Sequence, residues 1–351
     1  MIRKIFLLTL ALFSISGCQQ SSEKTPSFKI FDAKELKFAV PTDSGCPAHW
    51  DNGNFYIFSS SRDATRLSGT DIFHLDQVLP VAWDIEKERS RWIEATYKAP
   101  DGTLYGWYHH EMGPICKERL PDKWFAAAII GEGKSYDNGA TWQDLGFTIQ
   151  SDPNTYHCDT LNKYFPGGNG DFAVVNDQKN EYIYFFISTY GDFKEQGISV
   201  ARMRYADLEK PVGKVYKWYN GKWQEPGLCG KVTPIFPAFK DWHGPSPDSF
   251  WGPSVHWNTY LKTYVMLLNR AIDPNWWQEG IYISFNKDLS NPQGWSKPLQ
   301  VRKDGSWYPL VVGTDKKKEE TDKLAGRRAR YFEQGVSLWE IQFYKPGEKV
   351  K

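Results

Sequence analysis

The sequence lacks an excess of charge of either sign. Its 351 residues include 43 Lys and Arg against 42 Asp and Glu, so the formal net charge is +1. Because no strong positive field would attract phosphates, we expect no nucleic-acid partner. The chain also lacks a P-loop, a dinucleotide-binding glycine fingerprint, a G-x-S-x-G elbow and an H-E-x-x-H motif. These absences argue against nucleotide-dependent enzymes, α/β-hydrolases and zinc proteases.

No apolar run in the sequence is long enough to span a membrane stably. The N-terminus has a basic start and a short apolar stretch over residues 5–15, which is typical of a secretion signal. The following Ile15-Ser16-Gly17-Cys18 resembles the lipobox of bacterial lipoproteins. The resemblance implies a signal peptide over residues 1–17, a lipidated Cys18, and a tether over residues 18–27. We expect residues 28–351 to form a single domain.

The residue after the lipobox cysteine bears on location. Gln19 at this position is similar to that of lipoproteins sorted to an outer membrane. The resemblance implies a protein of the bacterial cell envelope that contacts the outer membrane only through its lipid and faces the periplasm or the surface. We expect the folded domain to be a monomer.

Aromatic residues are abundant, with 16 Trp, 19 Tyr and 21 Phe. β-Structure favours aromatic side chains, and packing accounts for many of them. Exposed Trp and Tyr rings can also stack on sugars, and composition alone leaves both interpretations open.

A strand–turn–strand phrase recurs five times along the chain, beginning near residues 46, 92, 170, 251 and 307. A repeat of antiparallel strands at this spacing predicts an all-β fold, a five-bladed β-propeller. Residues 27–40 are expected to add a strand that closes the last blade. The stretch from Ser135 to Trp142 matches the Asp box of sialidase-like propellers, so we interpret Asp137 as part of a turn and not of a catalytic site. The charged segment over residues 321–330 is predicted to be a surface helix.

The remaining cysteines are Cys46, Cys116, Cys158 and Cys229, and none of them forms a C-x-x-C pair. This spacing argues against a structural zinc site. An oxidising compartment permits one or two disulfides among three connectivities. Cys116 and Cys158 follow strands of neighbouring blades and could bridge two loops.

Three acidic residues lie at the starts of the innermost strands of successive blades: Asp43, Glu94 and Asp171. A propeller brings these strand starts to one axis, so the three carboxyl groups are expected to share a funnel. Glycosidic hydrolysis needs a proton donor and a second carboxylate with a different pKa, which a funnel can supply. The structural alternative is that such acids bond to neighbouring strand ends or hold a central water or cation.

Further residues are expected to line or border the funnel and to bind substrate: Glu111, His110, Asn169, Trp251, Arg270, Glu279 and Tyr308. Glu111 is also a reserve candidate for the proton donor, and Arg270 could bind a hydroxyl or the carboxylate of an acidic sugar. Adjacent residues on a strand point to opposite faces, so the His109-His110-Glu111 run does not predict a zinc site. His49 and His256 occupy equivalent repeat positions and are interpreted as structural. We predict no cofactor and no catalytic metal, while a structural cation such as calcium in the funnel stays open.

The placement of the three acids resembles that of the five-bladed propeller glycosidases of glycoside hydrolase family 43 and their relatives. In those enzymes an Asp of the first blade is the general base, an Asp of the second blade sets pKa and orientation, and a Glu of the third blade is the general acid. Asp43 matches the first role by position and type. Glu94 and Asp171 match the others by position, with the residue types exchanged. The chain also resembles bacterial propeller proteins that carry PAHW, GNGDF and WGPS motifs.

The first hypothesis is a glycoside hydrolase that acts on polysaccharide or oligosaccharide. A carboxyl separation of roughly 6.5 to 9.5 Å is expected for acids on different blades, and this separation predicts inversion. The alternatives are a non-catalytic glycan-binding propeller and a scaffold or adhesion lipoprotein with a protein partner.

Overall fold

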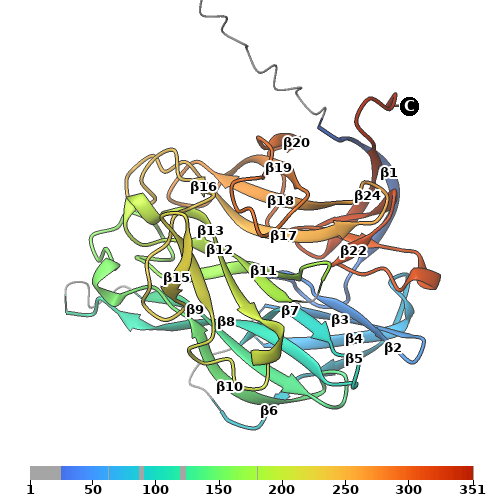
Figure 1. The fold of residues 1–351 in the computed structure, drawn as a ribbon, viewed down its shortest axis with the longest axis horizontal. Helices are drawn as coiled ribbons and strands as arrows, with labels where there is room; N and C mark the ends of the chain where they lie inside the picture. The colour runs from blue at the N-terminus through green and yellow to red at the C-terminus, as the bar shows by residue number, and fades with distance from the viewer. Residues whose placement is uncertain (1–24, 62, 87–90, 119–123, 180, 351) are drawn as a thin grey trace, which may run out of the picture.

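The computed structural model describes residues 25–61, 63–86, 91–118, 124–179 and 181–350. These residues contain strands and short 3-10 turns but no α-helix. Five mainly antiparallel sheets surround a common axis, which confirms the predicted five-bladed β-propeller (Figure 1). The predicted signal peptide and the lipidation site at Cys18 lie outside the described residues. Within them, no helix has the length and hydropathy needed to cross a bilayer.

The first two blades follow one another directly in the chain. The sheet of the first blade has the order β2(Ala48–Asp51), β3(Asn54–Ser60), β4(Ala64–Asp71) and β5(His74–Pro80). The second has the order β7(Trp92–Lys98), β8(Leu104–Ile115), β9(Phe125–Ser135) and β10(Thr141–Ile149), and β6(Ala82–Trp83) pairs with the outer edge of β10. The innermost strands of the two blades are β2 and β7, which contact each other.

The third and fourth blades keep this pattern. The third has the order β11(Asn169–Asn176), β12(Tyr182–Thr189), β13(Gly197–Arg204), β14(Tyr216–Tyr219) and β15(Lys222–Pro226), with β16(Phe236–Pro237) beside β13. The fourth has the order β17(Ser249–Asn258), β18(Thr263–Ala271), β19(Gln278–Asn286) and β20(Leu299–Lys303). The innermost strands β11 and β17 contact each other, so the blades meet at the axis.

The fifth blade joins the two ends of the chain. Its sheet has the order β21(Pro309–Gly313), β23(Arg328–Glu333), β24(Val336–Tyr344) and β1(Ser27–Lys37). The blue β1 lies antiparallel beside the red β24 (Figure 1). The predicted closure by an N-terminal strand is therefore confirmed, and it removes an open sheet edge.

The helix predicted over residues 321–330 is wrong. This segment contains β22(Leu324–Ala325), which pairs with β17 of the fourth blade, and the start of β23. In β23 only Arg328 is exposed, while Arg330 is buried and donates to Ser337 and to the carbonyl of Lys34. Pairing on both sides of β23 thus overrides a local preference for helix.

The Asp box forms the turn between β9 and β10. The carboxylate of Asp137 accepts hydrogen bonds from the main chain and hydroxyl of Thr141 and from Ser135. Trp142 is buried beneath the turn and donates to the carbonyl of Gly139, whose φ is +82°. These contacts confirm a turn device, because every interaction of the carboxylate is local.

The hydrophobic core lies between neighbouring blades. Trp107 of β8, for example, meets Phe185 of β12 edge-on, with ring centroids 5.7 Å apart, and both are fully buried. Each large apolar side chain buried in this way stabilises the fold by roughly 1.5–3 kcal/mol. A disulfide between Cys116 and Cys158 ties the end of β8 to the segment before β11, one of the pairings left open by the sequence. Cys46 and Cys229 are free thiols.

Candidate functional site

A cavity of about 70 Å³ lies where the innermost strands of the blades begin. Its lining combines acids, one histidine and aromatic rings. The lining residues are Asp43, Trp92, Glu94, His109, Glu111, Tyr164, Phe165, Asp171, Trp276, Trp307 and Tyr308. The three acids predicted from the strand starts therefore line one pocket, and we call it the axial pocket.

Asp43 is the half-buried acid of the axial pocket and comes from the segment that leads into β2. Its main-chain N–H donates to the carbonyl of Ser60 at 2.7 Å, which fixes the segment against β3. Burial, together with the negative charges of Asp171 and Glu111, raises the pKa of Asp43 to about 7, although His109 opposes the rise. An acid with this pKa exchanges its proton near neutral pH.

Glu94 is fully buried and lies at a β-bulge in β7, between Ile93 and Ala95. A bulge changes the direction of a side chain, and here it directs the carboxylate of Glu94 toward the third blade. Oε2 of Glu94 accepts a hydrogen bond from the N–H of Phe172 in β11 at 2.8 Å. Burial raises the pKa of Glu94 to about 8, and the charge of Asp171 adds to the rise against the opposing effect of His109.

Asp171 lies at the corresponding bulge of β11, between Gly170 and Phe172, with φ of +43°. A positive φ at a residue other than glycine is sparsely populated and gathers at functional sites. The hydroxyl of Tyr190 donates to Oδ2 of Asp171, and that of Tyr308 lies 3.3 Å from Oδ1. Burial raises the pKa of Asp171, against the opposing charge of His109 and the tyrosine hydrogen bonds.

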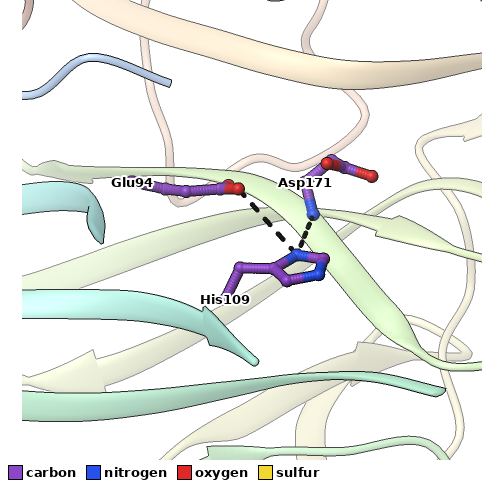
Figure 2. Close-up of side chains that lie close together, drawn as sticks. All are labelled: Glu94, His109 and Asp171. Atoms are coloured by element: carbon purple, nitrogen blue, oxygen red, sulfur yellow. Dashed lines mark hydrogen bonds and ion pairs between the residues drawn. The ribbon is translucent and has the colours of Figure 1, made fainter. Parts of the chain in front are cut away.

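His109 of β8 connects these acids, and the sequence reasoning did not select it. Its Nδ1 lies 3.4 Å from the main-chain nitrogen of Asp171 and 3.9 Å from Oε1 of Glu94 (Figure 2). Its Nε2 lies 3.8 Å from Oε1 of Glu111. When the ring is neutral, Nδ1 can accept a hydrogen bond from the N–H of Asp171. When the ring is charged, the protonated Nδ1 forms an ion pair with Glu94. Burial lowers the pKa of His109, but the hydrogen bond to Glu111 and the surrounding negative charges outweigh it and raise the pKa to about 9.

The close approach of β11 to this imidazole requires a glycine. A Cβ built on Gly170 would lie 2.7 Å from Cε1 of His109 and 2.5 Å from the Cβ of Ala128. The missing side chain at Gly170 thus permits the close approach of the backbone of β11 to the ring.

Glu94, His109 and Asp171 each offer a possible metal-ligand atom, all within 4.8 Å of one another. The fit to a cation is incomplete, because Oε2 of Glu94 already accepts from Phe172 and the Asp171 oxygens accept from two tyrosines. The Asp171 side chain also turns away from the imidazole, so its main chain and not its carboxylate faces the ring (Figure 2). The polar atoms of the cluster already have hydrogen-bond and ion-pair partners within the protein. That the protein needs no metal stays a prediction.

Glu111 and His110 are neighbours on β8, and the alternation of side chains along the strand places only one of them in the pocket. Glu111 shares a face of β8 with His109 and lines the axial pocket, with 31% of its side chain exposed. His110 points to the other face, where its ring stacks on Phe147 at 5.4 Å. The expectation that His110 binds substrate in the funnel is therefore corrected, since the strand alternates and the phase had been assigned to the wrong histidine.

The other predicted binding residues divide into one that lines the pocket and four that do not. Tyr308 lines it and contacts Asp171. Trp251 is fully buried behind the wall, where its ring packs on Trp276 and Tyr308. Asn169 is buried and accepts a hydrogen bond from Lys217. These contacts make Trp251 and Asn169 supports of the pocket and not part of its lining.

Arg270 and Glu279 belong to a separate cluster on the fourth blade. Nε and Nη2 of Arg270 bind the two oxygens of Asp248 at 2.8 and 2.9 Å, and the guanidinium lies over Phe239. Glu279 accepts from the hydroxyl of Tyr282 and lies 3.7 Å from Nη1 of Arg270. Neither residue lines the axial pocket, because each has its partners within its own blade.

Two segments supply most of the aromatic wall. The loop before β11 contributes Tyr164 and Phe165, and the loop before β19 contributes Trp276, whose indole donates to Asn162 of the first loop. Trp307 completes the wall from the segment before β21. The sequence gave no signal for Tyr164 and Phe165, because no repeat position marks that loop. His49 and His256 are buried away from the pocket, as their structural interpretation predicted.

Solved structures of similar shape include a thermostable family-43 glycoside hydrolase, with a TM-score of 0.51 and 12% identity over 87% of this chain and 89% of the other. They also include an endo-arabinase from Bacteroides thetaiotaomicron, with a TM-score of 0.51 and 11% identity over 89% of this chain and 96% of the other. The chain has the five-bladed propeller fold of these hydrolases. Identities this low establish the fold alone. No family model and no curated protein matches the sequence.

Proposed function

We propose that the protein is a glycoside hydrolase that cleaves polysaccharide or oligosaccharide by general acid–base catalysis in the axial pocket. One observation carries the proposal: acids from three successive blades line the same small pocket, and all three have raised pKa values. Glycosidic cleavage requires one carboxyl group that holds a proton and one that can take a proton from water. Burial and mutual repulsion supply both states at one pH.

Asp43 is assigned as the general base. It is the most exposed of the three acids, so water can reach its carboxylate, and its pKa of about 7 lets it ionise under physiological conditions. Its position before the innermost strand of the first blade agrees with the resemblance to family 43.

Asp171 is assigned as the proton donor. Its carboxyl group is buried and its raised pKa favours the protonated form, as for a carboxylic acid held in an apolar pocket. The hydroxyls of Tyr190 and Tyr308 hold the side chain in place. Glu94 does not attack substrate in this scheme. It positions Asp171 through the N–H of Phe172 and through His109.

The walls of the pocket suit a sugar. Carbohydrate rings present apolar C–H faces that stack on aromatic rings, and Trp92, Tyr164, Trp276 and Trp307 provide such surfaces. Glu111 is partly exposed beside them and can accept a hydrogen bond from a sugar hydroxyl. The similar structures are hydrolases by name, one of them an endo-arabinase, which supports the same reaction class.

The test is incubation of the purified protein with a polysaccharide panel, with release of reducing sugar as the readout. Asp43→Asn and Asp171→Asn should each lower kcat/KM by at least about a hundredfold, the range in which loss of a general acid or base falls. Asp76→Asn on exposed β5 is the matched control and should retain full activity. NMR of the first-formed anomer should show inversion.

Unchanged sugar release in both pocket variants would refute the assigned roles. Glycan that binds in the pocket but is never cut would instead identify a glycan-binding propeller.

The cell location is part of the same proposal. Residues 1–18 resemble a lipoprotein signal with Cys18 as the lipidated residue. A lipid on that cysteine would hold the propeller at the outer membrane with the pocket free for glycan. Metabolic labelling with a palmitate analogue, compared between the natural chain and Cys18→Ser, tests this location.

A further inference from the structure

The axial pocket holds more carboxyl groups than basic groups among its described lining residues. Four carboxyl groups line it, from Asp43, Glu94, Glu111 and Asp171, and His109 is the single basic group among the described lining residues. No lysine or arginine of the described chain lines it. The charge of His109 is already shared between Glu94 at 3.9 Å and Glu111 at 3.8 Å.

Three cations of the surrounding elements have their partners outside the pocket lining. Arg270 is bound bidentately by Asp248. Arg91 pairs with Asp144 at 3.0 Å and lies over the ring of Trp83. Lys217 is buried, and its Nζ donates to Asn169 and to two main-chain carbonyls. Among the described lining residues, a ligand carboxylate or sulfate would therefore meet His109 alone as a positive partner, and two acids already share its charge.

The aromatic wall adds to this preference. Trp92, Tyr164, Phe165, Trp276, Trp307 and Tyr308 surround the acids. The face of an aromatic ring carries partial negative charge, so it attracts cations and repels anions. Acids and rings thus act in the same direction on a charged ligand.

We infer that the axial pocket selects glycosyl units by charge, preferring an ammonium-bearing amino sugar to its uncharged parent and rejecting the corresponding uronate. This inference rests on the proposed function, since it assumes that the ligand is a sugar. It deepens that function by naming the chemical class of the bound unit. Glu111 is the specificity-determining residue, because its carboxylate is the partly exposed one that does not act in the chemistry assigned above.

The experiment measures binding and not turnover. Methyl glycosides of 2-amino-2-deoxyhexose, of the parent hexose and of the hexuronate are titrated calorimetrically into the protein at pH 7, in the gluco and galacto series. The amino sugar is expected to bind about tenfold more tightly than the parent, and the uronate at least about tenfold more weakly, each a difference of about 1.4 kcal/mol. Glu111→Gln should reduce both ratios at least threefold, while Glu35→Gln on exposed β1 should leave them unchanged.

The outcomes separate this inference from the proposed hydrolysis. Equal affinities, or a uronate that binds more tightly than its parent, would overturn the charge selection even if the protein hydrolyses glycans. The expected order of affinities without any hydrolysis would support the selection and refute the catalytic proposal. Failure of all the sugars to bind would overturn both. Ratios unchanged in Glu111→Gln would remove the role assigned to that residue.

Discussion

The axial pocket and the Arg270 cluster on the fourth blade are both acidic and aromatic, but they differ in one respect. In the Arg270 cluster a guanidinium binds Asp248 through two hydrogen bonds and also faces Glu279. In the axial pocket four carboxyl groups share one imidazole, and the pKa values of Asp43, Glu94 and Asp171 rise. The comparison indicates that acids with a matched cation build structure, while acids without one remain able to exchange protons.

The largest expected difference between the two clusters is in activity, and a matched pair of glutamates measures it. Glu94→Gln should lower kcat/KM by about a hundredfold, because the carboxyl group that positions Asp171 through Phe172 and His109 is replaced by an amide that cannot exchange a proton with the imidazole. Glu279→Gln should change kcat/KM less than threefold. Initial rates on the best substrate of the panel provide the measurement. Equal losses in the two variants would contradict the distinction between the clusters.

The second difference is in stability, where the Arg270 cluster should have the greater effect. Arg270→Met should lower the free energy of unfolding by about 2 kcal/mol, since Asp248 is left partly buried without its partner. Activity should stay within about threefold of the natural protein, because Arg270 does not line the pocket. Denaturant unfolding gives the free energy, and Arg204→Met at the exposed end of β13 serves as the control.

The third difference is in the response of stability to pH. Asp43 has a pKa of about 7 in the folded protein and an ordinary value of 3.8. Between these values the folded chain holds a proton that the unfolded chain releases, so the free energy of unfolding falls as pH rises from about 4 to 7. Asp43→Asn removes this contribution. The variant should match the natural protein near pH 4 and exceed its stability by about 1 kcal/mol at pH 8, after allowance for the partial exposure of Asp43.

Activity should respond to pH in the opposite direction. Ionisation of Asp43 creates the general base, so kcat/KM of the natural protein should rise as the pH approaches 7. A variant that is inactive yet more stable at pH 8 would show that the pocket keeps its repulsive charges for function. An Asp43→Asn protein less stable than the natural one at pH 8 would argue that Asp43 is structural.

The sequence predicted the meeting of Asp43, Glu94 and Asp171 because a propeller repeats one geometry around an axis. Strand starts that lie far apart in the chain become neighbours once the repeat is recognised. Which face of each strand points into the pocket was harder to predict. His110 was selected in place of His109 because alternation alone does not say which face is inward. The pairing of His109 with Trp92, and the bulge at Glu94, determine that face.

Two other errors have the same kind of cause. Arg270 was expected to line or border the funnel, but Asp248, which directly precedes β17, holds its guanidinium within the fourth blade. Residues 321–330 had helical composition, yet they pair with β17 and β21. In both cases contacts distant in sequence override the local pattern.

The smallest expected effect concerns the rim, where the aromatic wall of the axial pocket meets solvent. Trp277 has 71% of its surface exposed and directly follows Trp276 of the pocket lining. Tyr164, 40% exposed, also lies at the lining, so a long glycan leaving the pocket could stack on the rim. Trp277→Ala should raise KM for polysaccharide about fivefold, the loss of one stacking contact of roughly 1 kcal/mol. It should leave kcat unchanged.

A short aryl glycoside that fills only the pocket is the control substrate, and Tyr216→Ala on β14 of the third blade is the control variant. Trp277→Ala should not alter KM for the short aryl glycoside, and Tyr216→Ala should not alter KM for the polysaccharide. If Trp277→Ala changed KM equally for the short and the long substrate, Trp277 would act by supporting Trp276 and not by binding glycan. The rim would then belong to the structural part of the molecule, as the Arg270 cluster does, and sugar recognition would be confined to the axial pocket.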